Sequence, residues 1–268
     1  MILQSYITQW QAHAPWPYLD QVEHDLVLSR AICELYKAPV VASNLIFRGG
    51  TALHKLFFDR PGRFSEDLDF VQREAQPIGN TITAVRSCLD HWLGQPKWKQ
   101  GESRFTLYYR FETETEPVTQ RKLKVEINTR EHFNILPLKS VNFSVNSDWY
   151  KGCVGVSCYE LEELLATKLR ALYQRSKGRD LFDVWYACQK FPSLNLDKVV
   201  DVFANYMDRN QISITAKQYL ENLQKKKTSQ VFNDDIHLLL SPDVVDSYTQ
   251  SEAYDLLFDK VIARMRFT

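Results

Sequence analysis

Two short stretches in the N-terminal half carry residue types that could do phosphate and metal chemistry together. They are residues 47–55, FRGGTALHK, and residues 64–70, FSEDLDF. Two consecutive glycines after an apolar run predict a tight turn whose backbone can lie against a ligand. The peptide N–H groups of that turn, with a helix starting at Thr51, would form a cradle for an anion. The first stretch therefore predicts a phosphate site at Gly49 and Gly50.

Two carboxylates stand two positions apart in the second stretch, at Asp67 and Asp69. On a strand they point to the same face, while Leu68 and Phe70 point into the core. Carboxylates this close repel each other unless a cation lies between them. With a phosphate site nearby, the pattern predicts Mg2+ as that cation.

Each stretch alone is common, because Gly-Gly is usually a turn and Asp-x-Asp is usually a solvated strand end. Their combination is more specific: FRGGTALHK followed by RFSEDLDF resembles the first motif of the nucleotidyltransferase toxins of the AbiEii/AbiGii type, a branch of the polymerase-beta-like superfamily. The resemblance implies a nucleoside triphosphate (NTP) substrate and Mg2+ at the two aspartates. The residues expected to bind the nucleotide here are Gly49, Gly50, Thr51, Lys55 and Ser65.

A third carboxylate is expected on a later strand. Residues 104–112 and 123–128 alternate apolar and polar side chains, which predicts two neighbouring antiparallel strands. The polar face of the second strand carries Glu126, and a merely exposed polar face is the alternative to a metal site. The resemblance favours the metal site, because polymerase-beta-like enzymes place a third acidic residue on such a strand. Asn128 stands where a further acidic ligand could be, so one or two metal ions stay open.

The composition is that of a globular chain of 268 residues, with 44% hydrophobic and 25% charged residues. Lys+Arg and Asp+Glu balance at 33 each, so an RNA site would have to be a local patch. No apolar stretch reaches the roughly 18 residues of a membrane span. The start has no signal-peptide pattern, and we expect a cytoplasmic protein. The 5 cysteines are scattered and predict neither disulfides nor zinc.

Helical periodicity takes over in the C-terminal half. A capping box at residues 157–160 and a leucine stripe predict a helix to about Arg175. Lys168 lies on or beside that buried stripe, so its ammonium needs a partner or an anion. The alternative is that the side chain snorkels to the surface, in which case Lys168→Met should leave stability unchanged or slightly raised. Further helices are expected near residues 20–37, 78–93, 196–208, 214–226, 231–240 and 252–266.

A basic turn, RSKGRDLFD at residues 175–183, follows the lysine helix and enters another helix. Asp180 and Asp183 stand one turn apart near the helix start, which favours carboxylates. A well-capped helix with a basic loop is the simple alternative. However, ELLATKLRAL followed by RSKGRDLFD is similar to the later motifs of the same toxin family. That similarity implies that Lys168, Arg179, Asp180 and Asp183 complete the active site.

Together these patterns predict an α/β (α+β) fold. A polymerase-beta-like nucleotidyltransferase core with a mixed sheet and N-terminal helices is expected in residues 1–153, followed by an α-helical domain in residues 154–268. The expected catalytic residues are Asp67, Asp69, Glu126, Lys168 and Asp180, with Mg2+ on the first three. Arg179 and Asp183 are expected to orient the nucleotide or the lysine.

The expected reaction is transfer of a nucleoside monophosphate from an NTP to an acceptor hydroxyl, with release of pyrophosphate. The resemblance implies a toxin with a cognate antitoxin, and in some relatives the acceptor is a tRNA 3′ end. A small-molecule nucleotidyltransferase of the antibiotic-modifying kind shares the glycine turn and Asp-x-Asp, but the Arg179-Asp180-x-x-Asp183 turn argues against it. A catalytically silent module that binds nucleotide or RNA is another alternative, and the intact carboxylates speak against it.

Overall fold

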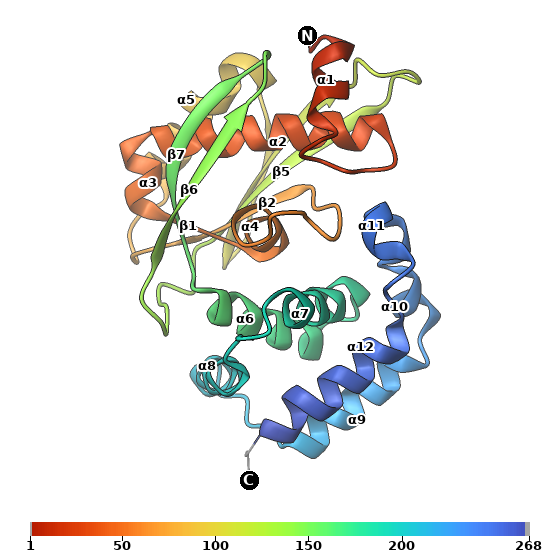
Figure 1. The fold of residues 1–268 in the computed structure, drawn as a ribbon. Coiled ribbons are helices and arrows are strands. Elements are labelled where there is room, and N and C mark those ends of the chain that lie inside the picture. The colour runs from red at the N-terminus through yellow and green to blue at the C-terminus, as the bar shows by residue number, and fades with distance from the viewer. Residues whose placement is uncertain (1, 266–268) are drawn as a thin grey trace. The chain divides into compact units, whose positions relative to one another are not determined.

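The computed structural model describes residues 2–265 (Figure 1). The chain divides into two compact units, of which the first ends at Tyr159 and the second begins at Glu160. The boundary expected from the sequence, between residues 153 and 154, lies inside a strand of the first unit. Each unit has its own buried core.

The first unit is built on a seven-stranded mixed sheet with the strand order β3-β4-β5-β2-β1-β7-β6. The β2–β5 and β1–β7 pairs are parallel, and the other neighbours are antiparallel. Both sequence motifs therefore meet near the middle of the sheet, on β1 and β2. The strands are β1 Leu45–Arg48, β2 Asp67–Gln72, β3 Lys97–Gln100, β4 Arg104–Glu112, β5 Gln120–Asn128, β6 Lys139–Asn146 and β7 Lys151–Cys158.

Side chains alternate between an apolar and a polar face along the strands, as the sequence predicts for residues 104–112 and 123–128. Leu123, Val125 and Ile127 on β5 are fully buried, whereas the residues between them are partly exposed. Leu68 and Phe70 are likewise buried on β2. The apolar face thus supplies the core, because every second residue of a strand points to the same side.

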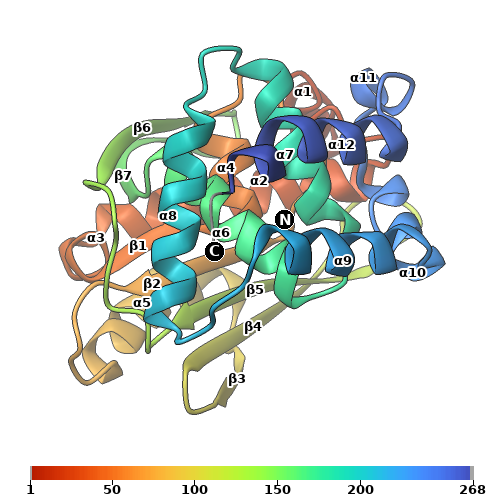
Figure 2. The ribbon, with the colours of Figure 1, turned by 90° about the horizontal axis from the view of Figure 1, so that it is seen from below.

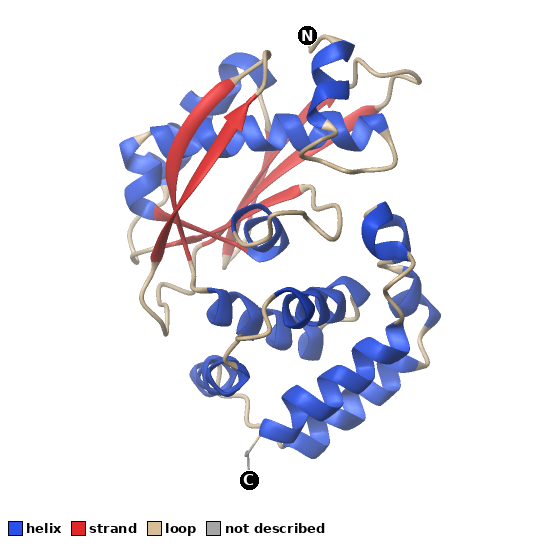
Figure 3. Cartoon of the chain, viewed as in Figure 1, coloured by secondary structure: helices blue, strands red, loops and turns tan. Residues whose placement is uncertain are grey.

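Helices α2 and α5 cover the apolar face of the sheet. α2 packs on β5, β6 and β7, and Figure 3 shows it crossing the red strands. The hydroxyl of Tyr109 on β4 donates a hydrogen bond to Asp90 of α5 at 2.8 Å. The helices of this unit are α1 Gln4–Trp10, α2 Leu19–Lys37, α3 Pro39–Asn44, α4 Gly49–Leu56 and α5 Gly79–Leu93.

The longer elements of the second unit are all helices. Its first helix, α6, packs against α7 and α8, and Figure 2 shows α8 beside it. The helices are α6 Leu161–Gln174, α7 Gly178–Lys190, α8 Leu196–Arg209, α9 Ala216–Lys227, α10 Gln230–Asp234, α11 Pro242–Val245 and α12 Gln250–Leu256. Short 3-10 turns are His237–Leu239 and Ile262–Arg264, and Leu257–Val261 is a π-helical turn. The predicted helix over 252–266 ends at Arg266, which lies outside the described residues.

The capping-box prediction at residues 157–160 is wrong. Ser157 stays in β7, where it pairs with Ser140 of β6, and its hydroxyl accepts a hydrogen bond from Arg73 at 3.0 Å. Helix α6 begins only at Leu161. Before it, β6 and β7 supply two strands of the same sheet.

Within the part of the chain that the structure describes, no helix combines the length and the apolar character needed to cross a bilayer.

Buried His24 should make the stability of the first unit depend on pH. The ring is 1% exposed and meets the rings of Phe64 and Phe111 edge-on, at 5.7 and 5.5 Å. Burial, with Arg121 nearby, lowers the pKa of His24 from 6.5 to about 4. The unfolded chain therefore binds one more proton between these two values, so stability falls as the pH drops through this window.

We expect the free energy of unfolding to fall by about 2 kcal/mol from this histidine between pH 7.5 and pH 5. His24→Leu should remove that part of the pH dependence, measured by urea unfolding followed by tryptophan fluorescence. The control, His91→Gln, changes an exposed histidine of α5 and should keep the full pH dependence. An equal pH dependence in His24→Leu and the unchanged protein would show that other groups cause it.

Candidate active site

Three carboxylates gather on the polar face of the sheet, where β2 lies beside β5. Asp69 pairs in register with Glu126, and Asp67 pairs with Lys124. Residues paired across neighbouring strands project to the same side of a sheet. Asp67, Asp69 and Glu126 therefore share one face, and all three side chains are partly exposed.

Lys124 is the cation that the structure places among these carboxylates. Its Nζ lies 2.8 Å from Asp67 Oδ2 and 3.7 Å from Glu126 Oε2. Burial raises the pKa of Asp67, Lys124 opposes this, and Asp69 adds to the rise. Burial alone would lower the pKa of Lys124, but its bond to Asp67 and the other carboxylates raise it. No sequence motif had assigned a role to this lysine.

The donor set suits Mg2+, because Asp67, Asp69 and Glu126 offer carboxylate oxygens, the ligands that this ion prefers. In the described residues, however, no group of three His, Cys, Asp or Glu side chains is already arranged around a common metal position. The reason is visible in the ion pairs: Lys124 holds Asp67, and Arg104 lies 3.7 Å from Glu126. Asp67 and Glu126 are thus oriented toward protein cations.

The glycine turn lies against the carboxylates of β2. Gly49 has a φ of +82°, which favours glycine, and a Cβ there would lie 2.5 Å from Asp69 Oδ2. A Cβ on Gly50 would lie 3.1 Å from Ser65 Oγ and collide with the guanidinium of Arg63. Glycine is thus required at Gly49, whereas a side chain at Gly50 would displace the guanidinium of Arg63, and the backbone at the start of α4 approaches Asp69 directly.

Thr51 and Ser65 fasten the glycine turn to the start of β2. The Thr51 hydroxyl donates to the carbonyl of Asp67 at 2.5 Å and lies 2.9 Å from the Ser65 hydroxyl. Arg63 is 2% exposed beside this turn and donates to the carbonyl of Phe64 at 3.0 Å. It stands inside the motif quoted from the sequence, yet its residue type alone did not single it out.

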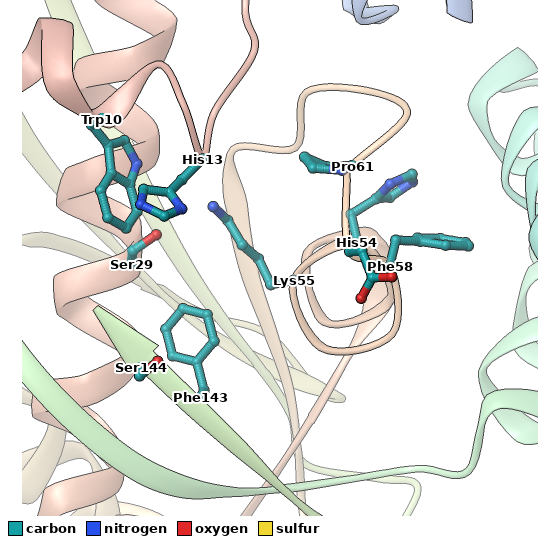
Figure 4. A pocket seen from close by; sticks show the side chains of 10 residues that line it. Trp10, His13, Ser29, His54, Lys55, Phe58, Pro61, Phe143 and Ser144 are labelled. Carbon is teal, nitrogen blue, oxygen red and sulfur yellow. The ribbon is translucent and has the colours of Figure 1, made fainter. Parts of the chain in front are cut away.

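Lys55 is drawn away from the carboxylate face. Its Nζ lies 2.5 Å from Oδ1 of Asp25 on α2, and Asp25 also accepts hydrogen bonds from the indoles of Trp10 and Trp16. The ammonium reaches into a pocket of about 130 Å³, shown in Figure 4, between α1, α2, α4 and β6. The carboxylates of β2 and β5 do not line this pocket. Its lining is Trp10, His13, Ser29, His54, Lys55, Phe58, Asp59, Pro61, Phe143 and Ser144.

Asn128 is the last residue of β5, and its side chain holds the turn that follows. Its side-chain oxygen accepts from the backbone N–H groups of Arg130 and Glu131, both at 2.9 Å. Glu131 in turn accepts a hydrogen bond from Arg48 at 2.9 Å. Burial alone would lower the pKa of Arg48, but Tyr159, Glu131 and Asp69 raise it. Arg48 and Glu131 border the site, although no sequence pattern had indicated a role for them.

A second cluster of charges lies inside the helical unit. Lys168 of α6 has its Nζ 2.7 Å from Asp183 Oδ2 and 3.2 Å from Asp180 Oδ1. Both aspartates are fully buried on α7, and Lys168 is 6% exposed. Arg175 adds two hydrogen bonds to Asp180, at 2.7 and 2.9 Å. The alternative that Lys168 snorkels to the surface is therefore wrong.

The charges in this cluster stabilise one another. Burial alone would raise the pKa of Asp180, but Lys168 and Arg175 lower it. Arg179 is not part of the cluster, because its Nε lies 3.3 Å from Oδ2 of Asp235, which also pairs with Lys177 at 3.1 Å. Of Lys168, Arg179, Asp180 and Asp183, the structure brings together three and pairs Arg179 with Asp235, just after the end of α10.

Removal of the buried ammonium should destabilise the helical unit. In Lys168→Met, Asp183 would lose its ion pair with Lys168, and Asp180 would keep only its ion pair with Arg175. Breaking a buried ion pair costs about 3–5 kcal/mol. We expect hydrogen-exchange protection of α6 and α7 to fall by that amount, contrary to the expectation from a snorkelling lysine. The control is Lys225→Met, at an exposed lysine of α9, which should change protection by less than about 0.5 kcal/mol. Unchanged protection in Lys168→Met would contradict the ion-pair assignment.

Comparison with protein families identifies relatives of this chain. The family model described as "Nucleotidyl transferase AbiEii toxin, Type IV TA system" matches residues 30–257. Comparison with curated proteins found no match.

Two solved structures resemble the chain over most of its length. The nucleotidyltransferase toxin MenT4 from Mycobacterium tuberculosis is 16% identical with a TM-score of 0.64, covering 100% of this chain and 89% of that one. JHP933 from Helicobacter pylori is 19% identical with a TM-score of 0.52, covering 91% of this chain and 94% of that one. At these identities the similarity shows a shared fold.

Proposed function

Because the chain belongs to the AbiEii nucleotidyltransferase toxin family, we propose that it transfers a nucleoside monophosphate from an NTP to the 3′ end of an RNA, such as a tRNA. The transfer releases pyrophosphate, and Mg2+ is the metal that we assign to it. Membership of a toxin–antitoxin family implies an NTP substrate and an antitoxin partner. In this proposal the antitoxin restrains the transfer reaction.

The observation that carries the proposal is the meeting of a glycine turn with three carboxylates on one sheet face. Asp69 lies against Gly49 and pairs in register with Glu126. A metal held by such carboxylates neutralises triphosphate charge and lowers the pKa of an attacking hydroxyl. Asp67, Asp69 and Glu126 would hold it, and Glu126 is also a candidate to accept the proton of the acceptor hydroxyl.

The glycine turn would bind the phosphates. Backbone N–H groups at the start of a helix stabilise anions, and α4 begins at Gly49. Ser65 lies beside Gly50 and can add its hydroxyl, while Thr51 fixes the turn to β2. Lys55 has a different position, because Asp25 holds it; we assign it to supporting α4.

In the helical unit we assign Lys168, Asp180 and Asp183 to a second functional cluster. The carboxylates hold the lysine ammonium in one place, and a preorganised charge is more effective in catalysis than a mobile one. Arg179 pairs with Asp235, and we assign it to fixing the start of α7. The support for this cluster is its motif and its burial.

Removal of one metal-binding carboxylate should abolish most of the activity. We expect Asp67→Asn and Asp69→Asn each to lower the transfer rate at least about 100-fold, or about 2.7 kcal/mol, because the amide keeps the shape and loses the charge. The assay follows labelled NTP transfer to total RNA with Mg2+, and EDTA should stop it. Glu126→Gln should also slow transfer.

The matched control is Glu74→Gln, which neutralises an exposed carboxylate just beyond the end of β2. Melting temperatures of all variants show whether each remains folded. Transfer at the normal rate in a folded Asp67→Asn or Asp69→Asn protein would overturn the assigned metal site. An unchanged protein that binds NTP without transferring it to RNA or to small molecules would instead favour a binding module.

A further inference from the structure

Basic side chains continue across the polar face of the sheet from the carboxylates to the edge strand β3. On β5, Lys122 precedes Lys124 by one position on the same face. On β4, Arg110 pairs with Lys122 and Arg104 pairs with Asn128, which puts both arginines on this face as well. We name the following five residues the basic strip: Lys97, Lys99, Arg104, Arg110 and Lys122.

The strip is joined to the carboxylates by cross-strand rows. Lys97 pairs with Tyr108, and Tyr108 pairs with Lys124, the partner of Asp67. In the neighbouring row, Lys99 pairs with Thr106, which pairs with Glu126. Adjacent strands are about 4.8 Å apart, so the strip covers roughly the 14 Å between β2 and the sheet edge.

The positive charges of the strip are available to a ligand. All five residues are exposed, and Arg104 keeps 61% of its side chain exposed although it lies 3.7 Å from Glu126. Lys122 lies over the ring of Tyr108, at 5.3 Å. Within residues 2–265, no ion pair involves Lys97, Lys99 or Arg110.

Acidic residues do not cancel this charge. On the same face of β3, β4 and β5 the carboxylates are Glu126, at the inner border, and Glu112, at the far end of β4. The whole chain has a formal net charge of zero, so the strip is a local excess of positive charge. Such an excess beside a site for nucleotide chemistry fits a polyanion.

We propose that the basic strip binds the phosphate backbone of the single-stranded 3′ end of the acceptor RNA and leads its terminal hydroxyl to the carboxylates. This inference rests on the proposed transfer reaction and names the surface that holds its acceptor. Lysine and arginine contacts to phosphates supply most of the sequence-independent affinity for nucleic acids. Tyr108, in the middle of the strip, offers a ring on which a base can stack.

Protection of the sheet edge is a simpler role for some of these residues. Lysines on an edge strand discourage pairing with another chain, which would account for Lys97 and Lys99 on β3. The same role is open to Arg110 and Lys122, because the part of β4 that pairs with β3 ends at Tyr108 and the part of β5 that pairs with β2 begins at Lys124. Charge reversal separates the two roles, because a glutamate still discourages pairing with another strand but repels phosphate.

The test compares two charge reversals in the full chain, Lys97→Glu/Lys99→Glu and Arg110→Glu/Lys122→Glu. The probe is a labelled single-stranded RNA of about 12 nucleotides, which spans sites of this kind. Its affinity is measured by fluorescence anisotropy between about 50 and 200 mM KCl. We expect each pair to lower the affinity at least about tenfold at low salt. The slope of log K against log salt should decrease by about 1.4, since each single-strand phosphate contact contributes about 0.7.

The control pair is Lys139→Glu/Lys151→Glu, at exposed lysines of β6 and β7. These two strands lie at the end of the strand order opposite to β3. The control pair should keep RNA affinity and slope, and all three variants should keep the rise in melting temperature with NTP and Mg2+. The proposal would be overturned if Arg110→Glu/Lys122→Glu bound RNA within about twofold of the wild-type affinity. The proposal requires at least a tenfold loss, which corresponds to about 1.4 kcal/mol. Binding of poly-glutamate but not of RNA by the wild-type protein would also overturn the proposal.

The outcomes also separate this inference from the proposed reaction. RNA binding that depends on the strip, in a protein that transfers no nucleotide, supports the strip as an RNA site and overturns the reaction. Transfer with an unchanged KM for RNA in both charge-reversed pairs supports the reaction and overturns the strip.

Discussion

The first unit depends on the neutralisation of carboxylates that share a sheet face. The register of β2 against β5 brings Asp69 beside Glu126, and Asp67 follows on the same face. Like charges this close raise the cost of ionisation unless a cation is near. Lys124 meets this constraint, because it lies opposite Asp67 and on the same side of β5 as Glu126. The folded chain therefore brings together acidic groups that would otherwise repel each other.

The helical unit meets the same constraint at greater burial. An exposed ion pair contributes little to stability, but Asp180 and Asp183 are fully buried, and an unpaired charge there would be costly. Lys168 from α6 and Arg175 from the turn pair with them. These bonds fasten the beginning of α7 to α6 and leave the ammonium of Lys168 in one position. Stability and the proposed function thus depend on the same side chains in this unit.

Local patterns predicted those elements whose burial repeats regularly along the chain. Strands over 104–112 and 123–128 were predictable because one face is apolar, and the helix over 20–37 was predictable from its apolar spacing. The capping box failed because Ser157 pairs in the sheet, and this pairing competes with any local cap. Lys168 could not be placed from its stripe alone, since its partners Asp180 and Asp183 lie on the next helix.

By itself, the sequence determined which residues could do the chemistry: a glycine turn, carboxylates two residues apart, and alternating strands that expose one polar face. Those features are local, because they depend on backbone freedom and on the side-chain period of a strand. The tertiary structure decided the partners. Lys55 pairs with Asp25, Lys124 with Asp67, and Arg179 with Asp235. Each of these ion pairs joins two residues that are far apart in the sequence and meet only in the folded chain. Neither composition nor local spacing could therefore indicate them.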